Sequence, residues 1–478
     1  MKKTKAFIVC FVVFFLPMIL LTSPVWSQEY TITMDQFLKG KTYYDDPRPL
    51  YDGDLAWRKI LPPEVLSKLS YDEETMKKEW ADLIGFKAPD VVGKIAPDIK
   101  PGKYTYQDKD KFPGLKELMI PNHYALFKPT GPPLAGSFPE ITVVPTTQLY
   151  HALPSIRETK KNMGRTKLDD LGYLNDATWV AGFPFPRPEG KFLAQQYIYN
   201  WEKQLVMGEN AWTLHDARGW NRNLREDTVG NIQQLDLKLS GRVLMPPYGW
   251  FDERAKNAGE YTSVFLLYDM PRDMYGNAMT RIAYRDRDTF DSFHLYINSI
   301  RRVRKMSATD TQDAMGGTDL IFEDKSGFGQ KLSPKRYPYK MEVIADREYL
   351  LPVSLDASEY IASKGAELRN VKFQRRPVVV LQLTQSDPNY VYSKRIIYID
   401  KETFNIIAAE NFDRKGRLYR TFTSWYYLEP KCGVYLIIVA LEHDYIDSHS
   451  TMLRPYMLLA PWMNRGHQDL GALIKRGK

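Results

Sequence analysis

The chain has 478 residues, of which 44% are hydrophobic and 26% charged. This length allows one large core or two smaller ones. Its 66 lysine and arginine residues against 58 acidic residues give a formal charge of +8, a mild excess that fits an ordinary solvated surface better than a surface for anionic lipid headgroups. The two cysteines, Cys10 and Cys432, exclude a disulfide-rich scaffold.

Residues 1–27 are predicted to form a signal peptide. The basic start Met1–Lys5 precedes an uncharged apolar run from Ala6 to Leu21, and Val25–Ser27 provides a cleavage site after its serine. The apolar run is shorter than the about 20 residues that span a bilayer, so cleavage is favoured over an uncleaved anchor. We therefore expect export to the periplasm of a Gram-negative bacterium, which makes nucleic acid an unexpected partner.

Residues 28–133 are predicted to form an N-terminal extension of short helices and loops. One helix is well marked, because Ser70 to Glu73 forms a capping box, Met76 and Trp80 then lie on one helical face, and Gly85 ends the pattern. Pro-Gly turn pairs interrupt the rest of the segment. The extension should therefore wrap around a larger body and form no core of its own.

A second helix is predicted over Lys191–Met207, after the rigid segment Gly182–Pro186. Beyond it, short runs rich in Val, Ile, Tyr, Phe and Thr predict strands. These runs are Ile232–Val243, Thr262–Tyr268, Ala278–Tyr284, Ser292–Ile297, Met341–Ile344, Pro377–Thr384, Val391–Ile399, Phe404–Phe412, Leu418–Leu428 and Val434–Leu441. The turns Asp400–Thr403 and Asp413–Gly416 predict consecutive hairpins. We predict an α+β, mainly antiparallel β chain with a barrel or strongly curved sheet.

Two of the predicted strands are apolar on both faces, over Val378–Leu381 and Tyr435–Leu441. A half-buried strand alternates apolar with polar residues, whereas these two strands do not. Both faces of the sheet must therefore be shielded from water along these segments. Two arrangements fit. In one, the sheet is packed between helices and a second layer; in the other, it curls around an apolar cavity that holds a hydrophobic ligand.

The sequence holds no nucleophile elbow, phosphate-binding loop, Cys-x-x-Cys or His-Glu-x-x-His motif, which counts against the commonest hydrolases, NTPases and zinc enzymes. His443, Asp447 and His449 share one face of an extended strand and suit zinc or iron, but such residues also gather at polar strand ends. We predict no catalytic residue, no metal site and no cofactor.

Two charged segments remain. Asp286, Asp288 and Asp291 have the chemistry of a glycosidase pair, but Arg285 and Arg287 interleave with them, so a self-paired loop is favoured. The cations at 301–305 either contact anionic headgroups or a membrane partner at a cavity mouth, or protect a solvated strand edge from aggregation. Both interpretations stay open.

Several motifs resemble the DUF1329 family in their order and spacing. They are Phe293–Ile297 leading into Ile300–Arg304, then Gly317–Asp319 and Glu323–Asp324, with Gly182–Pro186 upstream and Tyr398–Asp400, Glu402–Thr403, Asn411–Asp413 and Gly416–Leu418 downstream. That family is similar to the periplasmic lipoprotein carriers LolA and LolB. The resemblance implies a curved antiparallel sheet, partly closed by helices over an apolar cavity, and a place in outer-membrane lipid or lipoprotein traffic, with an RND-type transporter as an expected neighbour. His294 and Asn298 depart from the common pattern of the family.

We therefore predict a LolA-like β half-barrel domain over 134–460 with covering helices, and a C-terminal tail over 461–478. The expected function is a periplasmic carrier of a lipid, acylated protein or other hydrophobe, without catalysis. The alternative is a ligand-free interaction partner of an RND-type transporter or outer-membrane protein. The predicted cavity wall is Phe293, Tyr296, Leu381, Ile396, Tyr398, Phe404, Ile406 and Trp425, and the predicted headgroup or partner contacts are Arg301, Arg302 and Arg304.

Overall fold

The computed structural model describes residues 63–204, 208–307, 312, 314–315, 317–354, 363–364 and 366–468. The predicted signal peptide, the start of the extension and the end of the tail lie outside these residues. No helix in the described ranges is both long enough and apolar enough to cross a bilayer.

The main sheet contains 15 strands among the described residues. In spatial order they are β1 (Gly102–Thr105), β2 (Glu140–Val143), β14 (Val371–Gln385), β15 (Lys394–Asp400), β16 (Ile406–Phe412), β17 (Leu418–Glu429), β18 (Val434–Asp444), β19 (His449–Leu459), β3 (Asn210–Trp220), β4 (Glu226–Lys238), β7 (Glu260–Met270), β8 (Ala278–Tyr284), β9 (Ser292–Ile297) and β10 (Arg302–Lys305), with β11 (Tyr339–Ser354) beside β14. From β14 to β19 every neighbour is antiparallel. The predicted meander is confirmed.

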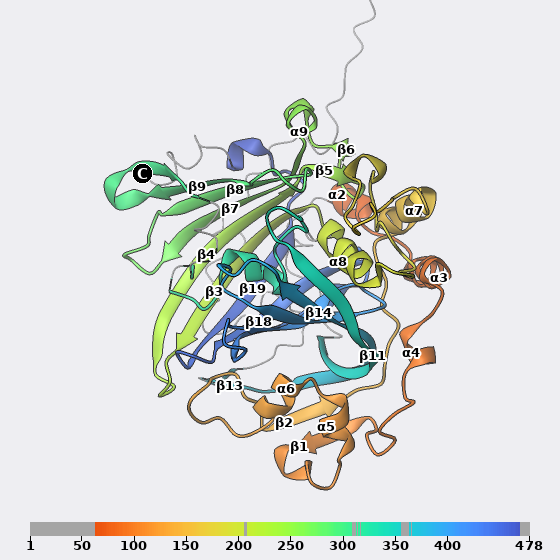
Figure 1. Ribbon diagram of the computed structural model, residues 1–478, viewed down its shortest axis with the longest axis vertical. Helices are drawn as coiled ribbons and strands as arrows, with labels where there is room; N and C mark the ends of the chain where they lie inside the picture. The colour runs from red at the N-terminus through yellow and green to blue at the C-terminus, as the bar shows by residue number, and fades with distance from the viewer. Residues whose placement is uncertain are drawn as a thin grey trace, which may run out of the picture.

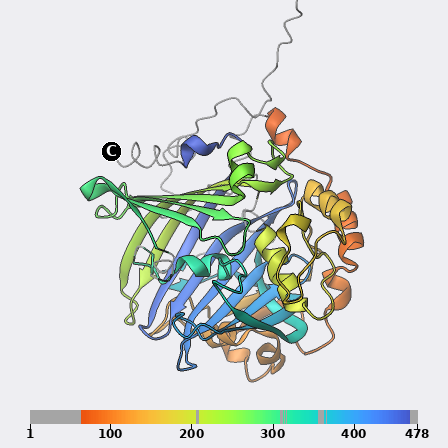
Figure 2. The ribbon, with the colours of Figure 1, turned by 45° about the horizontal axis from the view of Figure 1, so that its top comes forward.

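The sheet is strongly curved (Figures 1 and 2). β11 pairs antiparallel with β14 along most of its length, and its last residues, Val353 and Ser354, pair in parallel with Tyr426 and Tyr427 of β17. One end of the sheet thus curls back on itself, because β11 reaches a strand three places beyond β14. The predicted class, a mainly antiparallel half-barrel with covering helices, is confirmed.

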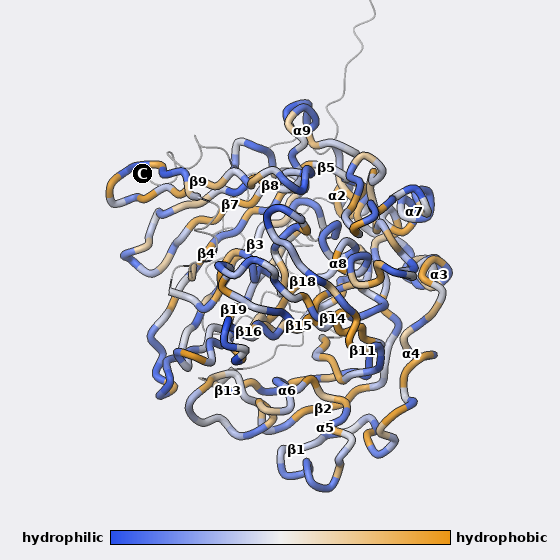
Figure 3. The backbone as a smooth tube through the Cα atoms, viewed as in Figure 1, coloured by the Kyte–Doolittle hydropathy of each residue, from blue (hydrophilic) through white to orange (hydrophobic). Residues whose placement is uncertain are grey.

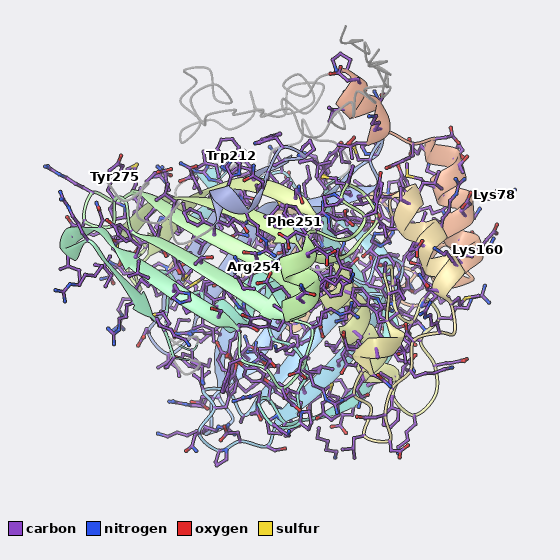
Figure 4. The ribbon with its side chains drawn as sticks, turned by 90° about the horizontal axis from the view of Figure 1, so that it is seen from above. Lys78, Lys160, Trp212, Phe251, Arg254 and Tyr275 are labelled. Carbon is purple, nitrogen blue, oxygen red and sulfur yellow. The ribbon has the colours of Figure 1, made fainter. Side chains whose placement is uncertain are left out.

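The helices and short strands surround this sheet. They are α2 (Pro63–Lys68), α3 (Glu73–Ile84), α4 (Ala88–Val91), α5 (Gly114–Leu118), α6 (Pro121–Leu126), α7 (Leu153–Asn162), α8 (Leu193–Gln204), α9 (Glu253–Ala258), η4 (Tyr106–Asp108), η5 (Asp176–Thr178), η6 (Asn298–Ile300), η8 (Phe322–Gly327), η9 (Arg465–His467), β5 (Ser240–Arg242), β6 (Gly249–Trp250), β12 (Ser363–Lys364) and β13 (Glu367–Leu368). α3 and α7 lie side by side and direct Lys78 and Lys160 outward (Figure 4).

The predicted helix after Ser70 forms as α3, but Asp72 is its N-cap, since the Asp72 carboxylate accepts the amide hydrogen of Thr75. The predicted capping box at Ser70 is therefore wrong in its details. Gly85 ends the helix with φ 91°, a conformation that glycine adopts without steric cost. Trp80, fully buried, donates its indole hydrogen to the carbonyl of Glu402 at 2.8 Å and so fixes α3 to the sheet.

Both faces of the sheet are dry, as the apolar runs require. Val378, Val379, Val380 and Leu381 have exposures of 0%, 0%, 2% and 0%, and hydrophobic colouring recurs along β14 in Figure 3. Val379 and Leu381 pack with α3, α7 and α8, and we call this side the inner face. On the opposite, outer face, Phe127 of the extension and the neighbouring Phe138 share one core with residues of β17, β18 and β19. Helices, α3 of the extension among them, cover one side, and other parts of the extension cover much of the other.

Candidate functional site

A pocket of about 90 Å³ lies on the inner face, beneath residues 317–330, which we call the cover. The cover contains η8, the teal helix near the centre of Figure 2. The lining comes from the cover and from β3, β4, β17, β18 and β19: Ala211, Thr213, His215, Gln234, Asp236, Leu320, Lys325, Ser326, Phe422, Ile437, Ala440, Glu442, Leu453, Pro455 and Met457.

The pocket lies where two neighbouring strands separate. β18 and β19 pair only as far as Ala440 opposite Leu453, whereas β19 continues to pair with β3 up to Leu459. Pro455 follows this point of separation. A proline cannot donate a ladder hydrogen bond, so it suits a strand that has lost its partner on one side. The sheet therefore opens at Pro455, and the cover closes the gap.

A chain of four polar side chains crosses the pocket wall. Lys325 of the cover donates to one oxygen of Asp236 at 2.9 Å, and the Gln234 amide nitrogen donates to the other at 2.6 Å. The Gln234 oxygen lies 3.1 Å from Nε2 of His215. Burial lowers the pKa of His215 to about 4, so the imidazole is neutral at physiological pH. The one lysine of the pocket wall is thus already paired with a carboxylate.

Glu442 forms the opposite end of the wall. Its side chain is 4% exposed, and its Oε1 atom has no hydrogen-bond partner among the described residues. Burial raises the pKa of Glu442 well above its usual range, and the nearby carboxylates of Asp324 and Asp319 raise it further. A carboxyl group in this environment stays protonated and uncharged at neutral pH.

Charged groups fix the cover to the sheet at three points. Asp324 accepts from the fully buried Arg395 at 2.5 Å. Asp319 lies 2.7 Å from the ring of His449, and Lys325 reaches Asp236. Asp319 and Asp324 are acidic positions of the Gly317–Asp319 and Glu323–Asp324 motifs. The sequence motifs therefore mark the anchors of the cover.

Apolar side chains also hold the cover in place. Ile321, Phe322 and Phe328 have exposures of 0%, 3% and 1%. Phe322 packs edge-on against Phe293 at 5.1 Å, and Phe328 belongs to the inner-face core. The cover is therefore a closed, well-packed element.

The eight predicted wall residues are all buried, but they lie in four separate clusters and none lines the pocket. The groups are Leu381 with Phe404 and Ile406 among the inner-face helices, Ile396 with Tyr398 beside β11, Tyr296 with Trp425 in the outer-face core, and Phe293 against the cover. Sequence reasoning missed the actual lining, for example Thr213, His215 and Met457, because β3 and β19 were not predicted as strands.

The predicted cationic contacts lie at the end of the sheet. Arg302 and Arg304 are exposed on β10, which is the terminal strand, and Arg301 is exposed in the turn before it. Two large apolar side chains lie in the adjoining turns: Ile300 is 57% and Tyr275 62% exposed. Asn298 joins these turns by donating to the carbonyl of Tyr275 at 3.1 Å, and Figure 4 shows Tyr275 at the margin of the molecule.

The residues with metal-like spacing do not converge. His443 contacts the carbonyl of Ala135 on the outer face, whereas His449 contacts Asp319 of the cover and Asp447 is exposed in the turn between them. Across the described ranges no group of three or more His, Cys, Asp or Glu side chains is arranged to hold a metal ion.

The arginines of the segment 285–291 do not pair with its own carboxylates. Arg285 pairs with Asp176 at 2.7 Å and Arg287 with Asp169 at 2.9 Å. Asp291 pairs instead with Arg281. The loop is charge-paired, as expected, but with partners elsewhere in the chain, so the prediction of a self-paired loop is wrong.

The fold and the pocket describe a curved-sheet protein with a covered inner face. Residues 111–467 match the family described as Protein of unknown function (DUF1329), and the chain belongs to this family. The predicted family is confirmed. No curated protein matches the chain.

Three solved structures are similar at low sequence identity. A putative outer membrane lipoprotein-sorting protein domain from Vibrio parahaemolyticus is 17% identical, with 56% of this chain and 92% of that chain covered and a TM-score of 0.39. A DUF1329 family protein from Desulfovibrio piger is 14% identical, with 55% and 91% covered and a TM-score of 0.40. A LolA superfamily protein from Nitrosomonas europaea is 13% identical, with 58% and 98% covered and a TM-score of 0.37.

Proposed function

We propose that this chain is a periplasmic carrier that shields a hydrophobic ligand, such as a lipid acyl chain or the acyl chains of a lipoprotein, on the inner face of its sheet and performs no chemical step. The observation that carries the proposal is the pocket beneath the cover. Its wall includes Phe422, Leu453 and Met457, and it lies where β18 and β19 separate. A concave, partly apolar site with a few polar groups is typical of small-ligand binding.

Ligand entry requires the cover to move. The pocket holds about 90 Å³, whereas sites for drug-sized ligands measure about 300–1,000 Å³. The closed structure therefore accommodates only a short part of a ligand. A long chain must displace the cover and take over the apolar contacts that Ile321, Phe322 and Phe328 now make.

Ligands that co-purify with the protein provide the test. The full-length protein is secreted, purified without detergent and extracted with organic solvent, and the extract is analysed by mass spectrometry. We expect a stoichiometric hydrophobic compound. Ala440→Phe, which fills the pocket, should abolish it, and Leu171→Phe, at a site that is 69% exposed, should not. An empty protein that also fails to bind added lipid contradicts the proposal.

The exposed arginines at the end of the sheet support a second element of the same function. We propose that Arg301, Arg302 and Arg304 contact anionic headgroups or a membrane protein such as an RND-type transporter. Exposed apolar side chains next to cations, here Ile300 and Tyr275, are common where proteins meet membranes. Replacing the three arginines with glutamine should reduce flotation with phosphatidylglycerol vesicles, while flotation with phosphatidylcholine vesicles stays unchanged.

The closed packing of the cover favours one alternative function. If the inner face is simply a core, the chain is a ligand-free interaction partner of a transporter or outer-membrane protein. The extraction experiment separates the two, because a scaffold yields no ligand and keeps its partner binding in Ala440→Phe.

A further inference from the structure

Three residues that line the pocket each carry a buried polar atom without a hydrogen-bond partner among the described residues. These atoms are Oγ1 of Thr213, Nδ1 of His215 and Oε1 of Glu442. Thr213 and His215 are two residues apart on β3, so their side chains project from the same face. A buried polar atom without a partner is destabilising. Such atoms around one pocket indicate that a polar part of a ligand completes them.

The hydrogen-bond chain decides which role His215 plays. The Gln234 amide nitrogen donates to Asp236, so the Gln234 oxygen faces His215 and must accept from Nε2. Nε2 therefore carries the hydrogen, and in the neutral ring Nδ1 is a hydrogen-bond acceptor. Nδ1 requires a donor from the ligand, and the Thr213 hydroxyl beside it can donate or accept.

The same chain leaves no counter-ion for an anionic headgroup. Lys325 is the single cationic residue among those that line the pocket, and it is held by Asp236 at 2.9 Å. Glu442 closes the other end of the wall with a buried carboxyl. A phosphate or carboxylate at this site would be buried without a partner charge, which is strongly unfavourable.

We infer that the ligand carried on the inner face bears an uncharged, hydroxyl-containing polar end, as in a monoacylglycerol or a long-chain alcohol. The hydroxyl donates to Nδ1 of His215 and exchanges a second hydrogen bond with Thr213, while the adjoining methylene groups lie against Leu453 and Met457. This inference rests on the proposed carrier function and specifies the class of ligand.

Competition between amphiphiles with the same acyl chain tests the inference. The purified, delipidated full-length protein is loaded with N-phenyl-1-naphthylamine, an uncharged fluorescent probe. It is then titrated with monooleoylglycerol, oleate and oleoyl lysophosphatidate. We expect monooleoylglycerol to displace the probe at an about tenfold lower concentration than either anion, because one buried hydrogen bond contributes about 1.4 kcal/mol, or a factor of ten.

Two variants place this preference at the pocket. Thr213→Val removes the hydroxyl at nearly constant volume, and His215→Phe replaces the acceptor with a somewhat larger apolar ring. Each should reduce the preference severalfold without weakening probe binding. Thr166→Val alters another buried threonine, 7% exposed against 1% for Thr213, that does not line the pocket and should keep the full preference. If His215→Phe does not fold, Thr213→Val still provides the readout.

The outcomes separate the inference from the carrier function. If no amphiphile displaces the probe, the carrier function itself is contradicted. If the three amphiphiles displace it equally, or if an anion displaces it better, the carrier function stands and the hydroxyl preference is wrong. A preference that persists in both His215→Phe and Thr213→Val also overturns the inference.

Discussion

We expect tight binding only of ligands whose acyl or alkyl chain exceeds a threshold length. The packing of the cover determines this length, because the cover must open to admit the chain. Moving the cover exposes Ile321, Phe322 and Phe328, which are now almost fully buried. At about 1.5–3 kcal/mol for each such side chain, opening costs about 5–9 kcal/mol. A ligand recovers about 0.8 kcal/mol for each methylene group that it buries. Opening is therefore offset only by chains of about 6–11 carbons, and tight binding begins beyond that length.

The threshold moves when the cover is loosened. Phe328→Ala removes a side chain that packs edge-on against Tyr339 and is 1% exposed. The loss of about 2 kcal/mol of burial lowers the cost of opening, so the threshold should fall by two or three carbons. The assay is displacement of N-phenyl-1-naphthylamine by a series of straight-chain alcohols.

Leu171→Ala provides the control, since this side chain is exposed and lies outside the cover. Its threshold should equal that of the unmodified protein. Binding that rises by the same factor for every added methylene from the shortest alcohol onward would refute the reasoning. An unchanged threshold in Phe328→Ala would refute it too, because both results mean that the cover does not have to open.

Three further predictions concern the charged groups around the pocket. Arg395→Met leaves Asp324 buried with the Tyr392 hydroxyl but without its ion-pair partner and should lower the free energy of unfolding by about 3–5 kcal/mol, whereas adding Asp324→Leu should restore most of it in urea denaturation. The hydrogen bond to Asp319 raises the pKa of His449 to about 9. The protonated imidazole therefore stabilises the folded protein fully below pH 6.5, and this stabilisation disappears as the pH rises toward 9. His449→Gln should remove this part of the pH dependence of the free energy of unfolding. Glu442→Gln should stabilise the protein at pH 7 more than at pH 4, because above pH 4.5 only the unfolded chain releases this proton.

Each of these predictions has a contradicting result. A double variant as unstable as Arg395→Met alone would mean that the unpaired Asp324 is not the cause of the loss. Stability that declines between pH 6.5 and 9 equally in the unmodified protein and in His449→Gln would assign that decline to other groups. A Glu442→Gln variant that is destabilised at pH 7 would mean that the carboxylate form is the one the fold prefers.

The sequence predicted the general architecture because that architecture depends on hydrophobic patterning. Val378–Leu381 is apolar at every position, and both of its faces are covered as this requires. The turn at Asp400–Thr403 was recognised from its residue types, and the hairpin of β15 and β16 forms around it. Such signals are local, so a single sequence reveals them.

The site was not predictable because its strands look unlike strands. In β3 the adjacent polar residues His215 and Asp216 interrupt the alternation of a half-buried strand, and β19 contains Pro455, which argues against a central strand. Only the sheet order, in which β19 lies beside β3 although they are far apart in the sequence, turns them into a pocket wall. The apolar residues chosen as wall candidates pack in four cores on both faces, since hydrophobicity alone does not specify the face on which a side chain lies.

The covering of the two faces identifies which one is free to bind. On the outer face the covering segment is integrated into the fold: β1 of the extension pairs with β2, and β2 pairs with β14. Displacing this segment would break the pairing of the sheet. The cover over the inner face is a short segment, and its contacts with β4 and β15 are made by side chains, Lys325 with Asp236 and Asp324 with Arg395. Charged groups regain hydration when they separate, so a cover held partly by ion pairs opens at a lower cost than an added strand. The inner face is thus the side on which a ligand can replace part of the protein.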